Sequence, residues 1–185
     1  AATAAFTSGA FFAFLGGGPF VATEILGLSP SGYGLYFVLL TFGYMIGNFI
    51  SARYSRLFGI NRMLLSGNLI AVGGMALSIL LFMIGYHHPL SLFVPVCIVG
   101  MGNGITLPNA NAGLVSVRPH LAGSASGLGG ALQIGGGAAL SVLAGAFLTV
   151  ESGPYPLLAV MTLSSLCAVG ATLYVIHVAR QRGEL

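Results

Sequence analysis

Long apolar runs, separated by short polar gaps, divide the chain into six segments. A helix needs about 20 apolar residues to cross the hydrocarbon core of a bilayer. The segments are continuously apolar, as in LSILLFMIG, whereas the strands of a membrane β-barrel alternate between apolar and polar positions. The pattern therefore predicts an all-α membrane protein, a single six-helix bundle over residues 1–185. The predicted spans lie near residues 1–22, 32–52, 63–85, 90–112, 123–149 and 155–178.

The composition agrees with this interpretation. Hydrophobic residues make up 56% of the chain and charged residues 5%, compared with about 25% charged residues in ordinary soluble domains. Such a composition argues against a nucleic-acid partner. It indicates that the lipid bilayer is the chain's main partner.

The few charges alternate between successive gaps. Arginines occupy the second gap, the fourth gap and the tail, whereas Glu24, the pair His87 and His88, and Glu151 occupy the first, third and fifth gaps. Because positive residues accumulate on the cytoplasmic side, we expect both chain ends to be cytoplasmic. The arginines expected in cytoplasmic loops are Arg53, Arg56, Arg62 and Arg118.

Glycine is unusually frequent, at 29 of 185 residues. In a bilayer, small residues allow helix backbones to approach closely, so glycines at helical spacing predict packing faces. Two pairs with this spacing are Gly43 with Gly47 and Gly100 with Gly104. The segment 123–149 is the richest in glycine. Its expected helix-packing positions are Gly123, Gly127, Gly130 and Gly137.

Several polar and aromatic side chains lie inside the predicted spans. Polar groups within a membrane face other helices or a water-filled cavity, which leaves two interpretations for Asn103, Asn109 and Gln133: bonds between helices, or the lining of a transport pathway. The aromatic residues Phe14 and Tyr36 leave the same choice open. Tyr36 belongs to an aromatic stripe on one helical face, formed by Tyr33, Tyr36, Phe37, Leu40 and Tyr44.

The sequence contains no signature of an enzyme. HExxH and GxSxG motifs are absent, His87 and His88 have no carboxylate cluster beside them, and the two cysteines lie in apolar runs. We therefore predict no catalytic residue and no metal site. All three acids lie outside the middle of the spans, so a proton-coupling carboxylate is expected elsewhere in a longer protein.

Three stretches carry a resemblance to a known family: TSGAFFAFLGGGPFV, GYGLYFVLLTFGYMIGNFISARYSRLFGINRMLLSG and PNANAGLVSVRPHLAGSASGLGGALQ. They resemble the C-terminal half of major facilitator superfamily transporters, specifically the Bcr/CflA-type drug resistance transporters. In the loop after the second span, Ser55 stands where that family's pattern has an acid. The departure argues against an acid-based gating latch.

The resemblance implies a specific function. The chain would supply helices seven to twelve of a proton-driven drug exporter in the bacterial inner membrane, with a proton gradient as energy source and no cofactor. Its partners would be an N-terminal six-helix half and a small apolar or amphipathic drug. The resemblance also places the first, second, fourth and fifth spans toward the central cavity. The alternative is a non-transporting assembly module that self-associates through its glycine-rich helices.

Overall fold

Six long helices form the structure, a computed structural model that describes residues 1–116 and 121–181. The helices are α1 (Ala2–Phe20), α2 (Pro30–Phe58), α3 (Ile60–Met83), α4 (Pro89–Ser116), α5 (Ala122–Ala146) and α6 (Tyr155–Gln181), with a π-helical turn η1 (Val21–Ile25) extending α1. Each is long and apolar enough to cross a membrane. The structure therefore confirms the all-α, six-helix fold class.

The helices extend further than the predicted spans at the arginine-containing end. The gap expected after the second span is almost entirely helical, because α2 continues to Phe58 and α3 begins at Ile60. Gly59 alone joins them, with φ +78°. Arginine is a good helix former, and Arg56, in the last turn of α2, is also favoured by the helix dipole. These charges therefore do not end the helix.

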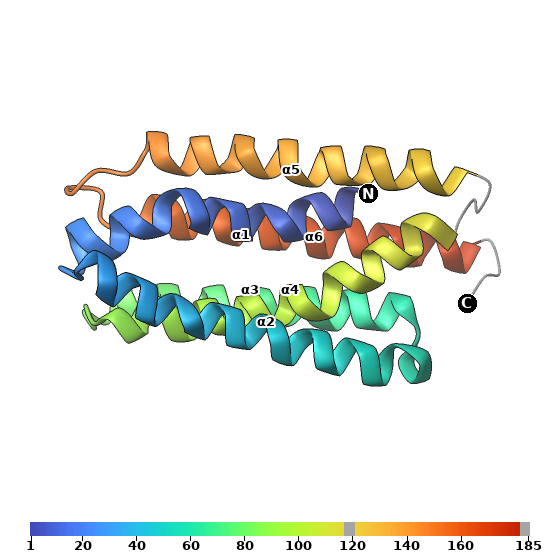
Figure 1. The fold of residues 1–185 in the computed structure, drawn as a ribbon, viewed down its shortest axis with the longest axis horizontal. Helices are drawn as coiled ribbons and strands as arrows, with labels where there is room; N and C mark the ends of the chain where they lie inside the picture. The colour runs from blue at the N-terminus through green and yellow to red at the C-terminus, as the bar shows by residue number, and fades with distance from the viewer. Residues whose placement is uncertain (117–120, 182–185) are drawn as a thin grey trace.

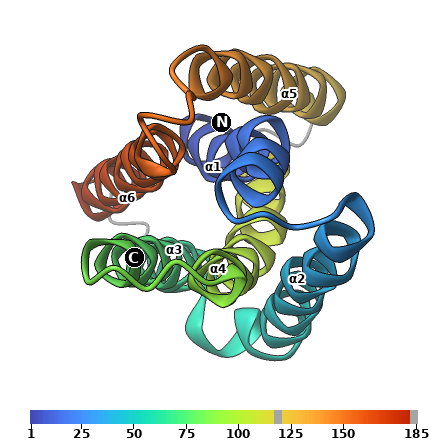
Figure 2. The same ribbon diagram turned by 90° about the vertical axis from the view of Figure 1, so that its left-hand side faces the viewer.

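The packing pattern repeats after three helices (Figure 2). Helix α4 packs between α2 and α3, and α1 packs in the same way between α5 and α6. Three further contacts, α1 with α4, α4 with α5 and α3 with α6, join the two sets. Helices three apart in the chain occupy corresponding places in the two sets and, because three is odd, run in opposite directions, which is the arrangement of an inverted repeat.

Glycine pairs on α2 and α4 allow those helices to approach closely. A Cβ added at Gly43 or Gly47 would collide with the backbone of Cys97 or Met101, and one added at Gly100 would lie 2.7 Å from the carbonyl oxygen of Leu40. The two glycine pairs noted in the sequence thus meet in one interface. Close backbone approach of this kind is how membrane helices associate.

The four glycines of α5 that were predicted as packing positions differ in their surroundings. Gly137 packs against the ring of Phe12. Gly123, Gly127 and Gly130, by contrast, have open space within 4 Å of an added Cβ among the residues that the structure describes. Within residues 1–116 and 121–181, that side of α5 has no neighbouring helix, so the packing role of these three glycines stays a prediction.

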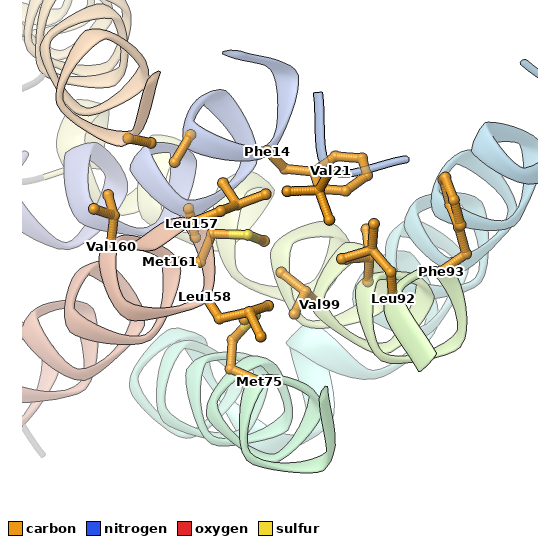
Figure 3. Packing of buried hydrophobic residues seen from close by; sticks show 14 of the residues in the cluster. Phe14, Val21, Met75, Leu92, Phe93, Val99, Leu157, Leu158, Val160 and Met161 are labelled. Carbon is orange, nitrogen blue, oxygen red and sulfur yellow. The ribbon is translucent and has the colours of Figure 1, made fainter. Parts of the chain in front are cut away.

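The main apolar core lies between α1, α3, α4 and α6 (Figure 3). Phe14, Met75, Val99, Leu157 and Met161 are all at most 1% exposed. A buried polar link crosses the bundle beside them: the Thr7 hydroxyl donates to Oδ1 of Asn68 at 2.8 Å, and Nδ2 of Asn68 donates to the Thr172 hydroxyl at 3.0 Å. Apolar packing and this link together hold α1, α3 and α6.

The charged residues separate by bundle end. The α1–α2, α3–α4 and α5–α6 connections lie at one end, and the α2–α3 connection and the end of α6 lie at the other (Figure 1). Glu24, His87, His88 and Glu151 therefore lie opposite the exposed arginines of α2 and α3. Arg118 falls outside the described residues. Which end faces the cytoplasm stays a prediction.

Candidate functional site

A cavity of about 280 Å³ lies between α1, α2 and α4. Helix α2 supplies one continuous face to it, because residues 37, 40, 41 and 44 follow the i, i+3, i+4, i+7 spacing of a helical stripe. Asn103 and Leu107, one turn apart, line it from α4. The lining residues are Phe11, Phe37, Leu40, Thr41, Tyr44, Asn103 and Leu107.

Asn103 is the most buried polar group in this lining. It is 2% exposed, and its amide nitrogen Nδ2 has no hydrogen-bond partner among the residues that the structure describes. Leaving a buried donor unsatisfied costs about 1–3 kcal/mol. The nitrogen is itself enclosed, so an oxygen atom of a ligand in the cavity would satisfy it only after the Asn103 side chain rotates.

The other lining residues define what the cavity can hold. Two aromatic rings, Phe11 and Phe37, and two leucines provide apolar surface, while Thr41 and Tyr44 add hydroxyl groups. All seven residues are uncharged. The chain's share of the cavity therefore suits a neutral, largely apolar molecule that carries a hydrogen-bonding oxygen.

A second buried polar group on α4 does not belong to the cavity. The hydroxyl of Thr106, a residue with 0% exposure, also has no hydrogen-bond partner in the described part of the chain. It lies against Gly67 of α3, on another side of α4. Asn103 and Thr106 thus differ in location although both are buried on one helix.

The remaining predicted pathway residues lie outside this cavity. Phe14 is fully buried, with its ring stacked at 6.3 Å on Phe37 and edge-on at 6.1 Å to Phe93. Tyr36 stacks on Phe93 at 5.2 Å. These aromatic residues pack between helices at the cavity's border.

Two of the predicted amides form interhelical hydrogen bonds. Asn109 donates to the Ser51 hydroxyl at 2.8 Å, which joins α4 to α2. Gln133, half-exposed on α5, donates to Oδ1 of Asn111 on α4 at 3.1 Å. Of the five predicted pathway residues, the structure places Asn103 in the cavity.

The sequence-based prediction missed part of the lining, although a signal for it was present. Phe37, Leu40 and Tyr44 belong to the aromatic stripe noted above, but only Tyr36 was singled out from it. Thr41 lies on the same face, since it follows Phe37 by one turn. The face of α2 was therefore a better guide than any single aromatic residue.

The chain is similar in part to a transporter. A stretch of 135 residues, 72% of this chain, is 30% identical to an uncharacterized MFS-type transporter, YdgK, of Bacillus subtilis (strain 168). The match covers 33% of that protein, so it spans about a third of the relative's length. No protein-family model matches the chain, and no solved structure matches it. The similarity supports membership of the major facilitator superfamily, and the six apolar helices fit one half of such a transporter.

Proposed function

We propose that this chain is the C-terminal half of a proton-coupled drug efflux transporter of the Bcr/CflA type, located in the bacterial inner membrane. In this proposal the cavity around Asn103 forms part of the drug-binding site. Three findings support it: the similarity to an MFS-type transporter, the six-helix bundle with its repeat after three helices, and the uncharged cavity between α1, α2 and α4. Rocking of two such halves around a central site is a general mechanism of these transporters.

The observation that carries the proposal is the position of the Asn103 amide. Other buried amides in this bundle are satisfied: Asn68 bonds to Thr7 and Thr172, and Asn109 bonds to Ser51. Asn103 instead lines a cavity, with an amide nitrogen that finds no acceptor in the described residues. In the proposed complex, a carbonyl or hydroxyl oxygen of the ligand would accept a hydrogen bond from this amide.

The least buried helices suggest where the other half sits. Helices α5 and α2 are the least buried of the six, and α1 and α4 the most buried. The open sides of Gly123, Gly127 and Gly130 on α5 would allow close approach by a helix of an N-terminal half. The packing role predicted for these glycines then applies between halves.

Proton coupling would come from that second half. None of helices α1 to α6 carries an aspartate or glutamate over its described length, and Glu24 is exposed in η1. A titrating carboxylate inside the membrane is a common element of proton-driven transport. This chain would then contribute apolar, aromatic and amide contacts to the drug.

The test is a transport assay on the full-length protein in proteoliposomes, with chloramphenicol as the probe and an imposed proton gradient. We expect gradient-dependent drug movement, and a KM about 2- to 10-fold higher in Asn103→Leu, since one hydrogen bond contributes about 0.5–1.5 kcal/mol. Thr106→Val is the matched control, because Thr106 is equally buried on α4 but lies outside the cavity.

Two outcomes would count against the proposal. Absence of gradient-driven movement of any drug in a panel would overturn the transport function. Equal kinetics for Asn103→Leu and Thr106→Val would overturn the site. The self-associating assembly module is the weaker candidate, because it gives no role to a cavity lined by Asn103.

A further inference from the structure

A larger groove of about 550 Å³ lies on the side of α4 between α2 and α3. Ile50, Tyr54 and Phe58 form its α2 wall at one-turn spacing, and Arg62 and Ile70 belong to its α3 wall. Met101 contributes to its floor from α4. The groove is separate from the Asn103 cavity, and the two share no lining residue.

The groove follows from how three helices pack. Helices α2 and α3 are joined by Gly59 alone, yet each packs mainly on α4. A Cβ added at Gly47 of α2 would collide with the backbone of Met101 on one side of α4, and one added at Gly67 of α3 would lie 2.7 Å from the Gly102 carbonyl oxygen on another. Helices α2 and α3 thus both pack closely on α4, and the space between α2 and α3 stays open.

The chemistry of the groove changes along its length. Its deeper part is apolar, with Ile50, Ile70 and Met101. Tyr54 and Phe58, whose ring centroids are 6.0 Å apart, follow toward the α2–α3 connection. Arg62, exposed in the first turn of α3, lies at that end. None of the residues that line the groove is acidic.

This order matches the parts of a phospholipid. Acyl chains require apolar surface, aromatic side chains favour the interface, and arginine binds phosphate at headgroup depth. We propose that the groove holds one anionic phospholipid, with an acyl chain along Ile50, Ile70 and Met101 and its phosphate on Arg62. The lipid would fill the space between α2 and α3. This site does not depend on the proposed drug transport.

The site is specific because of Arg62. Any apolar surface in a bilayer contacts lipid tails, but a fixed cation at the end of a groove selects a headgroup as well. Arg56 lies at the same end of the bundle, is exposed, and does not line the groove. Arg56→Gln is therefore a matched control, because it removes a positive charge from the same end of the bundle and leaves the groove lining unchanged.

The experiment is lipid titration of the purified full-length protein in detergent, followed by native mass spectrometry. We expect wild-type protein to retain one phosphatidylglycerol and to release phosphatidylcholine of the same acyl length. Arg62→Gln should weaken phosphatidylglycerol retention about fivefold, whereas Arg56→Gln should leave it unchanged. Ile70→Phe, which narrows the groove and keeps Arg62, should also weaken it.

Each alternative outcome has a distinct meaning. Equal retention of phosphatidylglycerol by wild type and Arg62→Gln would overturn the headgroup assignment, and undiminished retention by Ile70→Phe would overturn the acyl-chain site. If inorganic phosphate alone bound at Arg62 and prevented phosphatidylglycerol retention, Arg62 would be a site for free phosphate and not for a lipid. A dimer that excludes lipid from the groove would show that a second copy of the chain occupies it.

Discussion

Asn103 and Asn109 lie on the same helix, α4, and are buried to the same extent, but only Asn109 has its amide nitrogen hydrogen-bonded within the described residues. Nδ2 of Asn109 donates at 2.8 Å to the Ser51 hydroxyl and at 2.8 Å to the carbonyl oxygen of Ile105. Nδ2 of Asn103 has no such partner among the described residues, and Asn103 lines a cavity. Two residues of one type therefore differ in their surroundings: Asn109 joins α4 to α2, and Asn103 lines a cavity.

This difference predicts that the two asparagines affect the free energy of unfolding differently when each is replaced by leucine. Asn109→Leu should lower the free energy of unfolding by about 1–3 kcal/mol, because it removes a buried interhelical bond and leaves a hydroxyl partner behind. Asn103→Leu should leave stability unchanged or raise it, because it removes an unsatisfied buried group. Thermal or denaturant unfolding of the full-length protein in detergent measures both. Equal destabilisation by the two substitutions would contradict the distinction.

Gly73 and Gly74 provide a second contrast, between neighbours in α3. A Cβ at Gly74 would lie 2.8 Å from the carbonyl oxygen of Pro95 and 3.1 Å from Cβ of Ile98, whereas one at Gly73 meets open space in the described structure. We expect Gly74→Ala to lower the free energy of unfolding by about 1–3 kcal/mol through overpacking. Gly73→Ala should be neutral or raise it by up to about 1 kcal/mol, since alanine is the better helix former.

The same unfolding measurements check this pair, with Gly73→Ala as the control for a change of helix propensity alone. A destabilised Gly73→Ala would mean that this side of α3 packs on something that the six helices do not provide. If Gly74→Ala left the free energy of unfolding unchanged, α3 and α4 would be able to move slightly apart without loss of stability.

The sequence was sufficient to predict the fold class, because bilayer thickness sets the length of an apolar helix and every span satisfies it. It was also sufficient to identify α2 and α4 as helices with glycine pairs. It could not show which glycines are packed: Gly43 and Gly123 both belong to pairs with i, i+4 spacing, and of the two only Gly43 has a helix backbone against it in the part of the chain that the structure describes. Spacing defines a small face on a helix, and the neighbour of that face depends on the whole bundle.

The candidate site was predictable only in part for the same reason. Asn103 and Asn109 look alike in the sequence, and the Ser51 hydroxyl that distinguishes them lies on another helix. Phe14 was a reasonable pathway residue on an aromatic-rich helix, but its ring faces Phe37 and Phe93 rather than the cavity. Side-chain direction inside a bundle is a tertiary property, so hydropathy and periodicity do not determine it.

Gly59 supports a prediction that rests on backbone conformation rather than packing. It joins α2 to α3 with φ +78° and ψ 158°, a region populated almost only by glycine. Gly59→Ala should therefore lower the free energy of unfolding by about 1–3 kcal/mol, although a Cβ there has open space among the described residues. Gly34→Ala is the control, since Gly34 is helical and equally open. Equal stability of the two variants would show that the α2–α3 connection can rearrange at little cost.

The separation of charges predicts the orientation of the bundle in the membrane. Leu57, beside Arg56 in the last turn of α2, is 74% exposed, and Tyr86, beside the histidine pair between α3 and α4, is 49% exposed. In a protein with Cys97 and Cys167 replaced by alanine, we expect a membrane-impermeant maleimide to label Tyr86→Cys in intact cells. Leu57→Cys should react only after permeabilisation, because arginine-rich ends stay in the cytoplasm.

Permeabilised cells are the control for reactivity, since both cysteines should be labelled there. The reverse pattern in intact cells would place the arginine end outside. Arg62 and its groove would then face the outer leaflet, away from the anionic lipids that enrich the cytoplasmic surface. Because the labelling needs no transport activity, it tests the orientation separately from the proposed function.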